Sequence, residues 1–293
     1  MLKLRSPATV LLLAALTALG PLATDMYLPA LPAIARALDA GADQVQLTLS
    51  LYMAGFAISQ LLCGPLSDHY GRKPVLLAGF SIFTAASVLC ALAPNIETLL
   101  LGRFLQSFGG AVGPVLGRAA VRDIYQPLEA GRILSYMATV MALAPALAPI
   151  GGGLLLLFYG WDSIFLVLAA WGVIVIALLA LALPEPLPAT RRQPIRPRVI
   201  LSNFRMLLGE RSFIGYSLSN ACAFAGLFAF LSGSSFVLIE FLGVPPTSYG
   251  FYFAGGVAGF MVGSLIGGHF SRRCGIDRLI FAGAVLTTLG GSL

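Results

Sequence analysis

Long apolar stretches alternate with short polar ones along the whole chain. Each stretch holds about 20 apolar residues, enough for a helix to cross a hydrocarbon core of ~30 Å. The stretches fall at 7–29, 44–66, 74–93, 98–120, 132–157, 163–183, 212–239, 248–270 and 277–293. Backbone groups in lipid must be satisfied within such a segment, so we expect each stretch to be helical. The pattern predicts an all-α polytopic membrane protein with about nine transmembrane helices.

Composition agrees with this class. Hydrophobic residues make up 58% of the 293 positions, and the mean hydropathy is +0.90, more apolar surface than a protein facing water can bury. The net charge of +6 could suggest a nucleic-acid partner, but the basic residues lie in short loops without interleaved aromatic residues. The four cysteines stand singly, with no Cys-x-x-Cys spacing, which predicts neither a disulfide framework nor a metal site. The expected surroundings are a lipid bilayer.

The basic residues also predict an orientation. Of the 18 Lys and Arg residues, 16 fall on one side of the predicted spans, Arg36 falls on the other, and Arg103 lies inside a span. By the positive-inside rule, the N-terminus is then cytoplasmic. The first apolar stretch follows Lys3 and Arg5 and could pass for a signal peptide, but so many spans follow that we expect a retained anchor.

One connector differs from the others. Residues 184–211 contain five prolines and six arginines, and they read as a cytoplasmic linker between two bundles. We therefore expect an N-terminal six-helix bundle at 1–183 and a C-terminal bundle at 212–293. Orientation explains the arginines of the linker, and binding of lipid headgroups is the alternative.

A weak internal repeat supports two bundles. A shift of 204 residues places the sequence Ala-Gly-Phe of 54–56 on that of 258–260. The same shift places Gly64 on Gly268 and Gly71 on Gly275. The loop 270–278 is therefore interpreted as a degenerate copy of the loop after the second span.

That earlier loop, residues 64–74, is the most polar part of the chain between two spans. Asp68 and Arg72 stand four residues apart and can pair if the turn stays helical. The loop resembles the signature G-x-L-x-D-x-x-G-R-K/R of the major facilitator superfamily, and the matching residues are Gly64, Leu66, Asp68, Gly71, Arg72 and Lys73. The resemblance implies a charge network in which Asp123, at the end of the fourth span, joins Asp68 and Arg72 and holds one conformation. Exposed loop charges of little energetic weight are the alternative.

The resemblance also implies twelve helices in two six-helix bundles, each the repeat of the other. The chain offers six before the linker and about three after it. We therefore expect a C-terminally truncated chain with an incomplete second bundle; a complete nine-helix protein is the alternative.

Two charged residues lie inside predicted spans. Asp25 sits toward the outer part of the first. A carboxylate near the bilayer centre costs about 2.5–3.5 kcal/mol, so we expect this one to be protonated, paired or facing water. Arg103 sits in the fourth, and with Gln106 it resembles the superfamily pattern R-x-x-Q-G, in which Ser107 replaces the glycine. We hypothesise that Asp25 takes up and releases a proton and that Arg103 tunes it. A hydrated Asp25 at the helix mouth and a purely structural Arg103 are the alternatives.

The fifth span contains two prolines four residues apart among small residues, which predicts a bent helix that packs closely. It resembles the antiporter signature G-P-x-x-G-G of the superfamily, with the matching residues Pro145, Ala148, Pro149, Gly152 and Gly153. Opposite it we expect the eighth span, with a glycine every four residues from Gly255 to Gly267, so that the two form a rocking seam between the bundles. General packing of small residues is the alternative.

The segment 24–32 together with the fifth span is similar to the Bcr/CflA group of bacterial drug:proton exporters. That similarity implies alternating-access export of small amphiphilic substrates, driven by the proton gradient without another cofactor, by a monomer in the bacterial inner membrane. Candidate residues of the substrate cavity are Tyr27, Tyr52, Phe56, Gln106, Tyr136, Met137 and Phe224. A carrier for an amino acid or sugar is the alternative, and a channel or receptor is a different class. An enzyme is excluded because the spans contain no cluster of catalytic groups.

Overall fold

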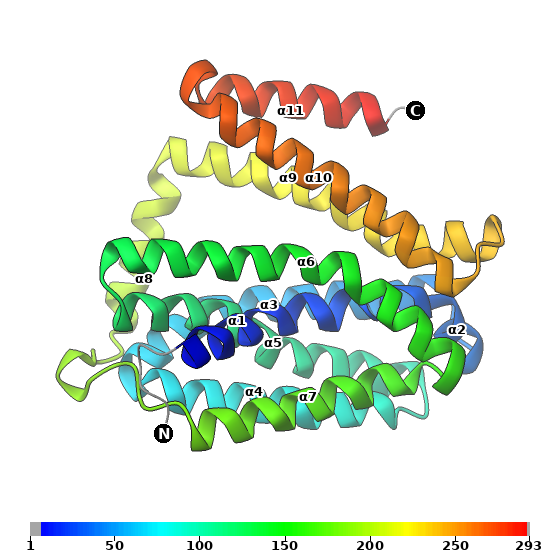
Figure 1. Ribbon diagram of the computed structural model, residues 1–293, viewed down its shortest axis with the longest axis horizontal. Coiled ribbons are helices and arrows are strands. Elements are labelled where there is room, and N and C mark those ends of the chain that lie inside the picture. The colour runs from blue at the N-terminus through cyan, green and yellow to red at the C-terminus, as the bar shows by residue number, and fades with distance from the viewer. Residues whose placement is uncertain (1–6, 292–293) are drawn as a thin grey trace. The chain divides into compact units, whose positions relative to one another are not determined.

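The computed structural model describes residues 7–291, without the side chains of 7, 142, 268, 271–274 and 276. The described chain is helical throughout, with no strand (Figure 1). Ser271 and Arg272, in the predicted copy of the polar loop, have side chains outside this description. Eight of the nine predicted spans coincide with helices that are long and apolar enough to cross a membrane. The ninth coincides with α11 (Ile276–Gly291), a helix of 16 residues.

The chain divides into two compact units. The first comprises residues 1–195 and 235–254, and the second comprises residues 196–234 and 255–293. Residues 184–195, which the sequence assigns to the linker, fall within the first unit. The division into two bundles joined by a linker at 184–211 stays a prediction.

The first unit contains six of the eight candidate spans. It consists of α1 (Pro7–Asp25), the 3₁₀ turn η1 (Leu28–Ala30), α2 (Leu31–Ala37), α3 (Ala42–Tyr70), α4 (Arg72–Ala91), α5 (Ile96–Ile124), α6 (Pro127–Tyr159), α7 (Asp162–Leu181) and η2 (Ala189–Arg191). The segment 235–254 adds the π-helical turn η3 (Phe236–Phe241) and the start of α10 (Pro246–Cys274). The first span is interrupted between α1 and α2, where Pro29 and Pro32 cannot donate backbone hydrogen bonds.

Local sequence explains several helix ends. Asn95 caps α5 by accepting a hydrogen bond from the backbone N–H of Thr98 at 2.9 Å. Pro127 opens α6 at a position where a missing N–H costs nothing. Gly71 adopts φ 103° between α3 and α4, a conformation that favours glycine and lets the chain reverse within one residue.

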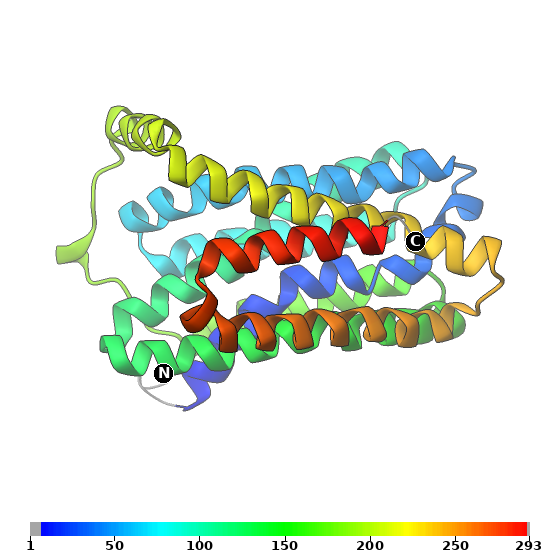
Figure 2. The ribbon, with the colours of Figure 1, turned by 90° about the horizontal axis from the view of Figure 1, so that it is seen from above.

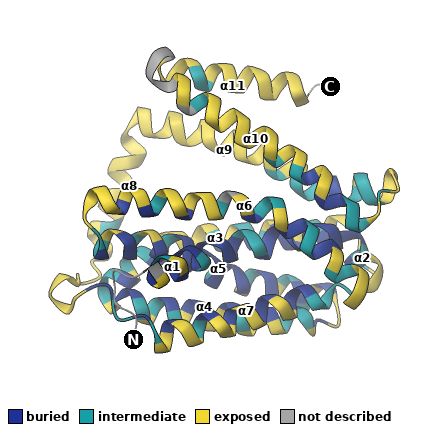
Figure 3. Cartoon of the chain, viewed as in Figure 1, coloured by how far each residue is buried: buried dark blue, intermediate teal, exposed yellow. Residues whose placement is uncertain are grey.

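Helix α5 lies at the centre of the first unit and packs against α1, α3 and α4. Helix α7 packs on α4, and α6 packs on α1. Close approach depends on small residues: a Cβ atom at Gly113 of α5 would overlap the carbonyl oxygen of Leu16 in α1. Figure 3 shows the buried residues concentrated on the faces where these helices meet.

The second unit consists of α8 (Pro197–Gly209), most of α9 (Arg211–Ser235), most of α10 and α11. Its side chains are mostly exposed (Figure 3). Helix α8 forms within the segment that the sequence indicated as a linker, and its presence was not predicted. Pro197 stands at its first turn, where a fixed φ suits a helix start.

Candidate functional site

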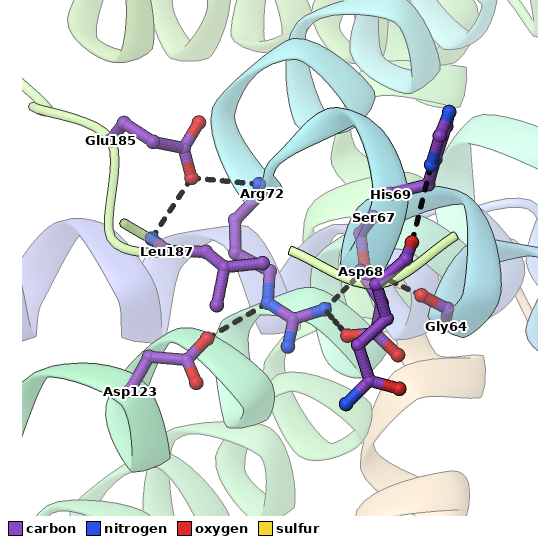
Figure 4. Close-up of polar contacts among 9 residues, drawn as sticks. Gly64, Ser67, Asp68, His69, Arg72, Asp123, Glu185 and Leu187 are labelled. Carbon is purple, nitrogen blue, oxygen red and sulfur yellow. Dashed lines mark hydrogen bonds and ion pairs between the residues drawn. The ribbon is translucent and has the colours of Figure 1, made fainter. Parts of the chain in front are cut away.

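Arg72 is the centre of a charge cluster at the turn between α3 and α4. Its Nη1 lies 2.6 Å from Asp68 Oδ1, and its Nε donates to Asp123 Oδ2 at 2.8 Å. Its Nη1 also donates to the hydroxyl of Ser67. Figure 4 shows the guanidinium lying between the two carboxylates. The structure thus brings together three residues that the sequence placed in one network, and it ties the end of α3 to the end of α5.

Glu185 is a fourth member of this cluster, and sequence reasoning missed it. Its carboxylate accepts a backbone hydrogen bond from Arg72 at 2.8 Å (Figure 4) and another from Lys73 at 3.2 Å. It therefore caps the N-terminus of α4 from a segment more than a hundred residues away, where the helix dipole favours negative charge. The one available signal was that Glu185 is the only acid between Asp162 and Glu210.

The chain after Glu185 stays on the same turn. The backbone N–H of Gln193 donates to the carbonyl of Asp68 at 2.9 Å, and the carbonyl of Gln193 lies 3.2 Å from Nδ1 of His69. On the other side, Lys73 Nζ donates to the carbonyl of Ala180 at 2.9 Å. Residues 185–193 therefore act as a strap across the polar turn. Gly64 lies in α3, one turn before this cluster, and its carbonyl accepts from Ser67.

A second cluster surrounds Arg103 inside the first unit. Arg103 is completely buried, and its Nη1 donates to the carbonyl of Ala23 at 3.1 Å and to Gln106 Oε1 at 2.6 Å. Gln106 in turn donates to Ser87 Oγ at 2.7 Å. The cluster joins α1, α4 and α5.

Aromatic rings complete the surroundings of this guanidinium. Its carbon lies 4.6 Å from the ring centroid of Tyr27, 4.3 Å from that of Tyr52 and 5.8 Å from that of Phe165. Such contacts stabilise a desolvated cation. Within the described residues, Arg103 Nε and Nη2 and the hydroxyl of Tyr52 have no hydrogen-bond partner. The cluster therefore offers three buried donors without an acceptor.

Asp25 is the last residue of α1, and only 6% of its surface is exposed. In the part of the chain that the structure describes, no ion pair joins it to Arg103. The connection is indirect: Arg103 binds the carbonyl of Ala23, two residues before Asp25. Sequence reasoning thus named both residues, and the structure places Arg103 of α5 against the turn of α1 that contains Asp25, without direct pairing.

The predicted cavity residues fall into two groups. Tyr27, Tyr52 and Gln106 are fully buried around Arg103, and Met137 is 3% exposed. Phe56 is partly buried, whereas Tyr136 and Phe224 are exposed at 51% and 55%. The first group packs inside the first unit in this structure. A shared substrate cavity stays a prediction.

The predicted hinge residues lie in one continuous helix, α6, with Pro145 and Pro149 inside it. A Cβ atom at Gly152 would overlap the carbonyl oxygen of Met26, and one at Gly153 would lie 2.6 Å from the carbonyl oxygen of Pro246. Ala148 is 3% exposed. Helix α6 therefore packs between the end of α1 and the first turns of α10, ahead of the glycine stripe that begins at Gly255.

Comparison with known proteins decides the family. The model of the Major Facilitator Superfamily matches residues 13–293. The chain belongs to the Major Facilitator Superfamily. Members of this superfamily are carriers, so the chain is a multi-pass membrane transporter and not an enzyme.

Several curated members of the superfamily are similar over most of the chain. An uncharacterized transporter of Bacillus subtilis, YdgK, is 39% identical over 96% of this chain and 73% of its own length. A bicyclomycin resistance protein homolog of Haemophilus influenzae is 32% identical over 96% of this chain and 71% of its own length. The multidrug resistance protein MdtL of Escherichia coli is 34% identical over 80% of this chain and 59% of its own length.

Solved structures of the superfamily share the fold. A bacterial homolog of the human lysosomal transporter Spinster, in an inward-facing and unoccupied conformation, matches with a TM-score of 0.76 at 19% identity, over 91% of this chain and 62% of that one. A D-xylose-proton symporter matches with a TM-score of 0.65 at 12% identity, over 91% of this chain and 69% of that one. The chain therefore spans about three fifths of the Spinster homolog.

Proposed function

We propose that this chain belongs to a proton-coupled secondary transporter that exports drugs or other small amphiphilic molecules by alternating access. The relatives named for bicyclomycin resistance and multidrug resistance support the substrate class. The observation that carries the proposal is a nearly buried acid, Asp25, on the turn of α1 that the buried Arg103 holds.

Proton coupling is the part that Asp25 would supply. A proton moving down a membrane potential of 100 mV contributes about 2.3 kcal/mol, enough to concentrate a neutral substrate more than tenfold. A carboxyl group that binds this proton must alternate between the two sides of the membrane. Asp25 ends a helix at the break before η1, a place where a small movement of α1 relative to α2 changes access to the side chain.

Arg103 fits a role in the same cycle. Its free donors require an acceptor, and the carboxylate of Asp25 or a polar group of the substrate would provide one after a rearrangement of the turn at 23–25. We propose that Tyr27, Tyr52, Phe56, Gln106, Tyr136, Met137 and Phe224 line the substrate path during that cycle. No cofactor besides the proton gradient is proposed.

The remaining parts of the proposal follow from orientation. We propose a cytoplasmic N-terminus, which the arginine-rich connectors support, in a monomer of the bacterial inner membrane whose two bundles are linked by residues 184–211. A carrier for an amino acid or sugar is the competing function. It would transport its substrate without conferring drug resistance.

The test is export by the purified chain in vesicles with an imposed pH gradient, together with drug susceptibility of a host that lacks its own pumps. Asp25→Asn should lose proton-driven export, because the amide cannot carry a proton, while membrane insertion stays normal. Asp39→Asn is the matched control, since Asp39 is exposed and its φ of 48° is one that asparagine tolerates. Normal proton exchange by Asp25→Asn would remove Asp25 from the mechanism.

A further inference from the structure

Helix α8 has two chemically different faces, unlike the spanning helices of this chain. Ile200, Phe204 and Leu207 follow one another at spacings of four and three residues, which places them on one side of the helix. Arg198 and Arg205, seven residues apart, share another side. The 13-residue helix is too short to cross a bilayer, and its pattern is that of a helix lying at a boundary between water and an apolar phase.

Among the described residues of its own unit, the apolar side of α8 is largely uncovered. Every residue of α8 except Ile200 is exposed; on the apolar side Phe204 and Leu207 are exposed at 39% and 40%, and beside it Leu201 and Leu208 are exposed at 71% and 62%. A contiguous apolar surface of this kind marks a place where another phase or molecule binds.

The charge of the residues around α8 indicates which molecules bind this surface. Between Glu185 and Glu210 the chain contains no acidic residue. It does contain five arginines, at 191, 192, 196, 198 and 205. An uninterrupted basic segment beside a transmembrane helix is attracted to anionic lipid. A guanidinium can bind the oxygens of a phosphate with two parallel hydrogen bonds.

The direction of α8 places it at the membrane surface. Glu210 adopts an extended conformation that ends α8, and the spanning helix α9 begins at the next residue. The two helices do not continue one another: α8 runs across the direction of α9 in both views (Figures 1 and 2). A helix joined by one residue to the end of a span, and running across it, lies along the bilayer surface.

We propose that α8 is an interfacial anchor that binds anionic phospholipid. Its apolar side, with Ile200, Phe204 and Leu207, enters the boundary between headgroups and acyl chains. Arg198, Arg205 and the arginines ahead of the helix bind headgroup phosphates. The anchor fixes the depth at which α9 enters the membrane and is independent of the substrate that the transporter carries.

The test uses the whole chain in vesicles and a tryptophan as a depth probe. Trp161 and Trp171 are replaced by phenylalanine, and Phe204→Trp supplies the only tryptophan. Lipids with brominated acyl chains should quench its fluorescence. Ser202→Trp, on the polar side of α8, is the matched control and should be quenched less.

Lipid selectivity is measured by comparing the quenching when only phosphatidylglycerol carries bromine with the quenching when only phosphatidylcholine does. We expect stronger quenching by the anionic lipid. Arg198→Gln and Arg205→Gln should each reduce this preference roughly fivefold, and added salt should reduce it further. Arg132→Gln, an exposed arginine that donates to Tyr136 in its own helix, should leave it unchanged.

Two results would overturn the proposal. Absence of quenching at Phe204→Trp would mean that water or another protein segment covers α8. Equal quenching by both lipids would mean that the arginines bind no headgroup. Leu201→Trp repeats the measurement if Phe204→Trp fails to insert.

Discussion

Arg36 Nη1 lies 3.1 Å from Glu240 Oε1, and the two residues are separated by 204 positions, the shift that aligns the two copies of the sequence repeat. The pair ties α2 to η3 near the start of α3, whereas the Arg72 cluster lies at the far end of α3. The first unit therefore has an ion pair at each end.

The Arg36–Glu240 pair should influence conformation more than stability. Its side chains are 65% and 42% exposed, and such pairs contribute about 0–1 kcal/mol. Arg36→Glu should therefore change the ratio of populations with short and long distances between α2 and η3 by up to roughly fivefold. Spin labels on the two elements and electron spin resonance measure these distances. The exchanged double variant Arg36→Glu/Glu240→Arg should restore it. If the double variant behaves like the single ones, the pair does not hold this contact.

Glu185→Gln should loosen the start of α4. The amide keeps the shape of the side chain but loses the negative charge and one of the two oxygens that accept from the backbone N–H groups of Arg72 and Lys73. Losing a cap of this kind costs about 1 kcal/mol, which corresponds to roughly fivefold faster hydrogen exchange at those two amides. Glu210→Gln, an exposed acid between α8 and α9, is the control. Unchanged exchange at 72 and 73 would show that the cap contributes nothing.

Arg103→Lys should destabilise the protein although it preserves the charge. A lysine lacks the planar fork that reaches the carbonyl of Ala23 while it faces Tyr27 and Tyr52. We expect a loss of about 1–3 kcal/mol, seen as a lower unfolding temperature in detergent, and a changed dependence of export on pH. Arg118→Lys on the same helix is the control, because Arg118 is exposed and donates to Pro114. Equal effects of both variants would argue against a special role for Arg103.

Gly152→Ala should disturb the contact between α6 and α1. The added methyl group would overlap the carbonyl oxygen of Met26, and overpacking of this kind costs about 1–3 kcal/mol. Gly151→Ala is a matched control one residue away, where an added Cβ meets nothing within 4 Å. The comparison is made by thermal stability of the purified variants. Equal stability of the two would mean that α6 can shift without penalty.

Much of the fold could be predicted because it depends on length and hydropathy. Runs of about 20 apolar residues predicted eight spanning helices that the structure contains. Asp68 and Arg72, four residues apart at a helix end, could be paired in advance because neighbouring helical turns fix that distance. Helix α8 was missed because five prolines and an excess of arginine around it favoured an irregular linker.

The sequence alone determined the class of protein, the superfamily and the identity of the two charged residues inside spans, Asp25 and Arg103. Only the tertiary structure decided the contacts between distant segments: Ala23 and three aromatic rings meet Arg103, Glu185 meets the start of α4, and Glu240 meets Arg36. The reason is physical. Spanning helices are apolar on nearly every side, so periodicity does not fix their rotation, and each of these contacts joins segments far apart in the chain whose meeting depends on that rotation.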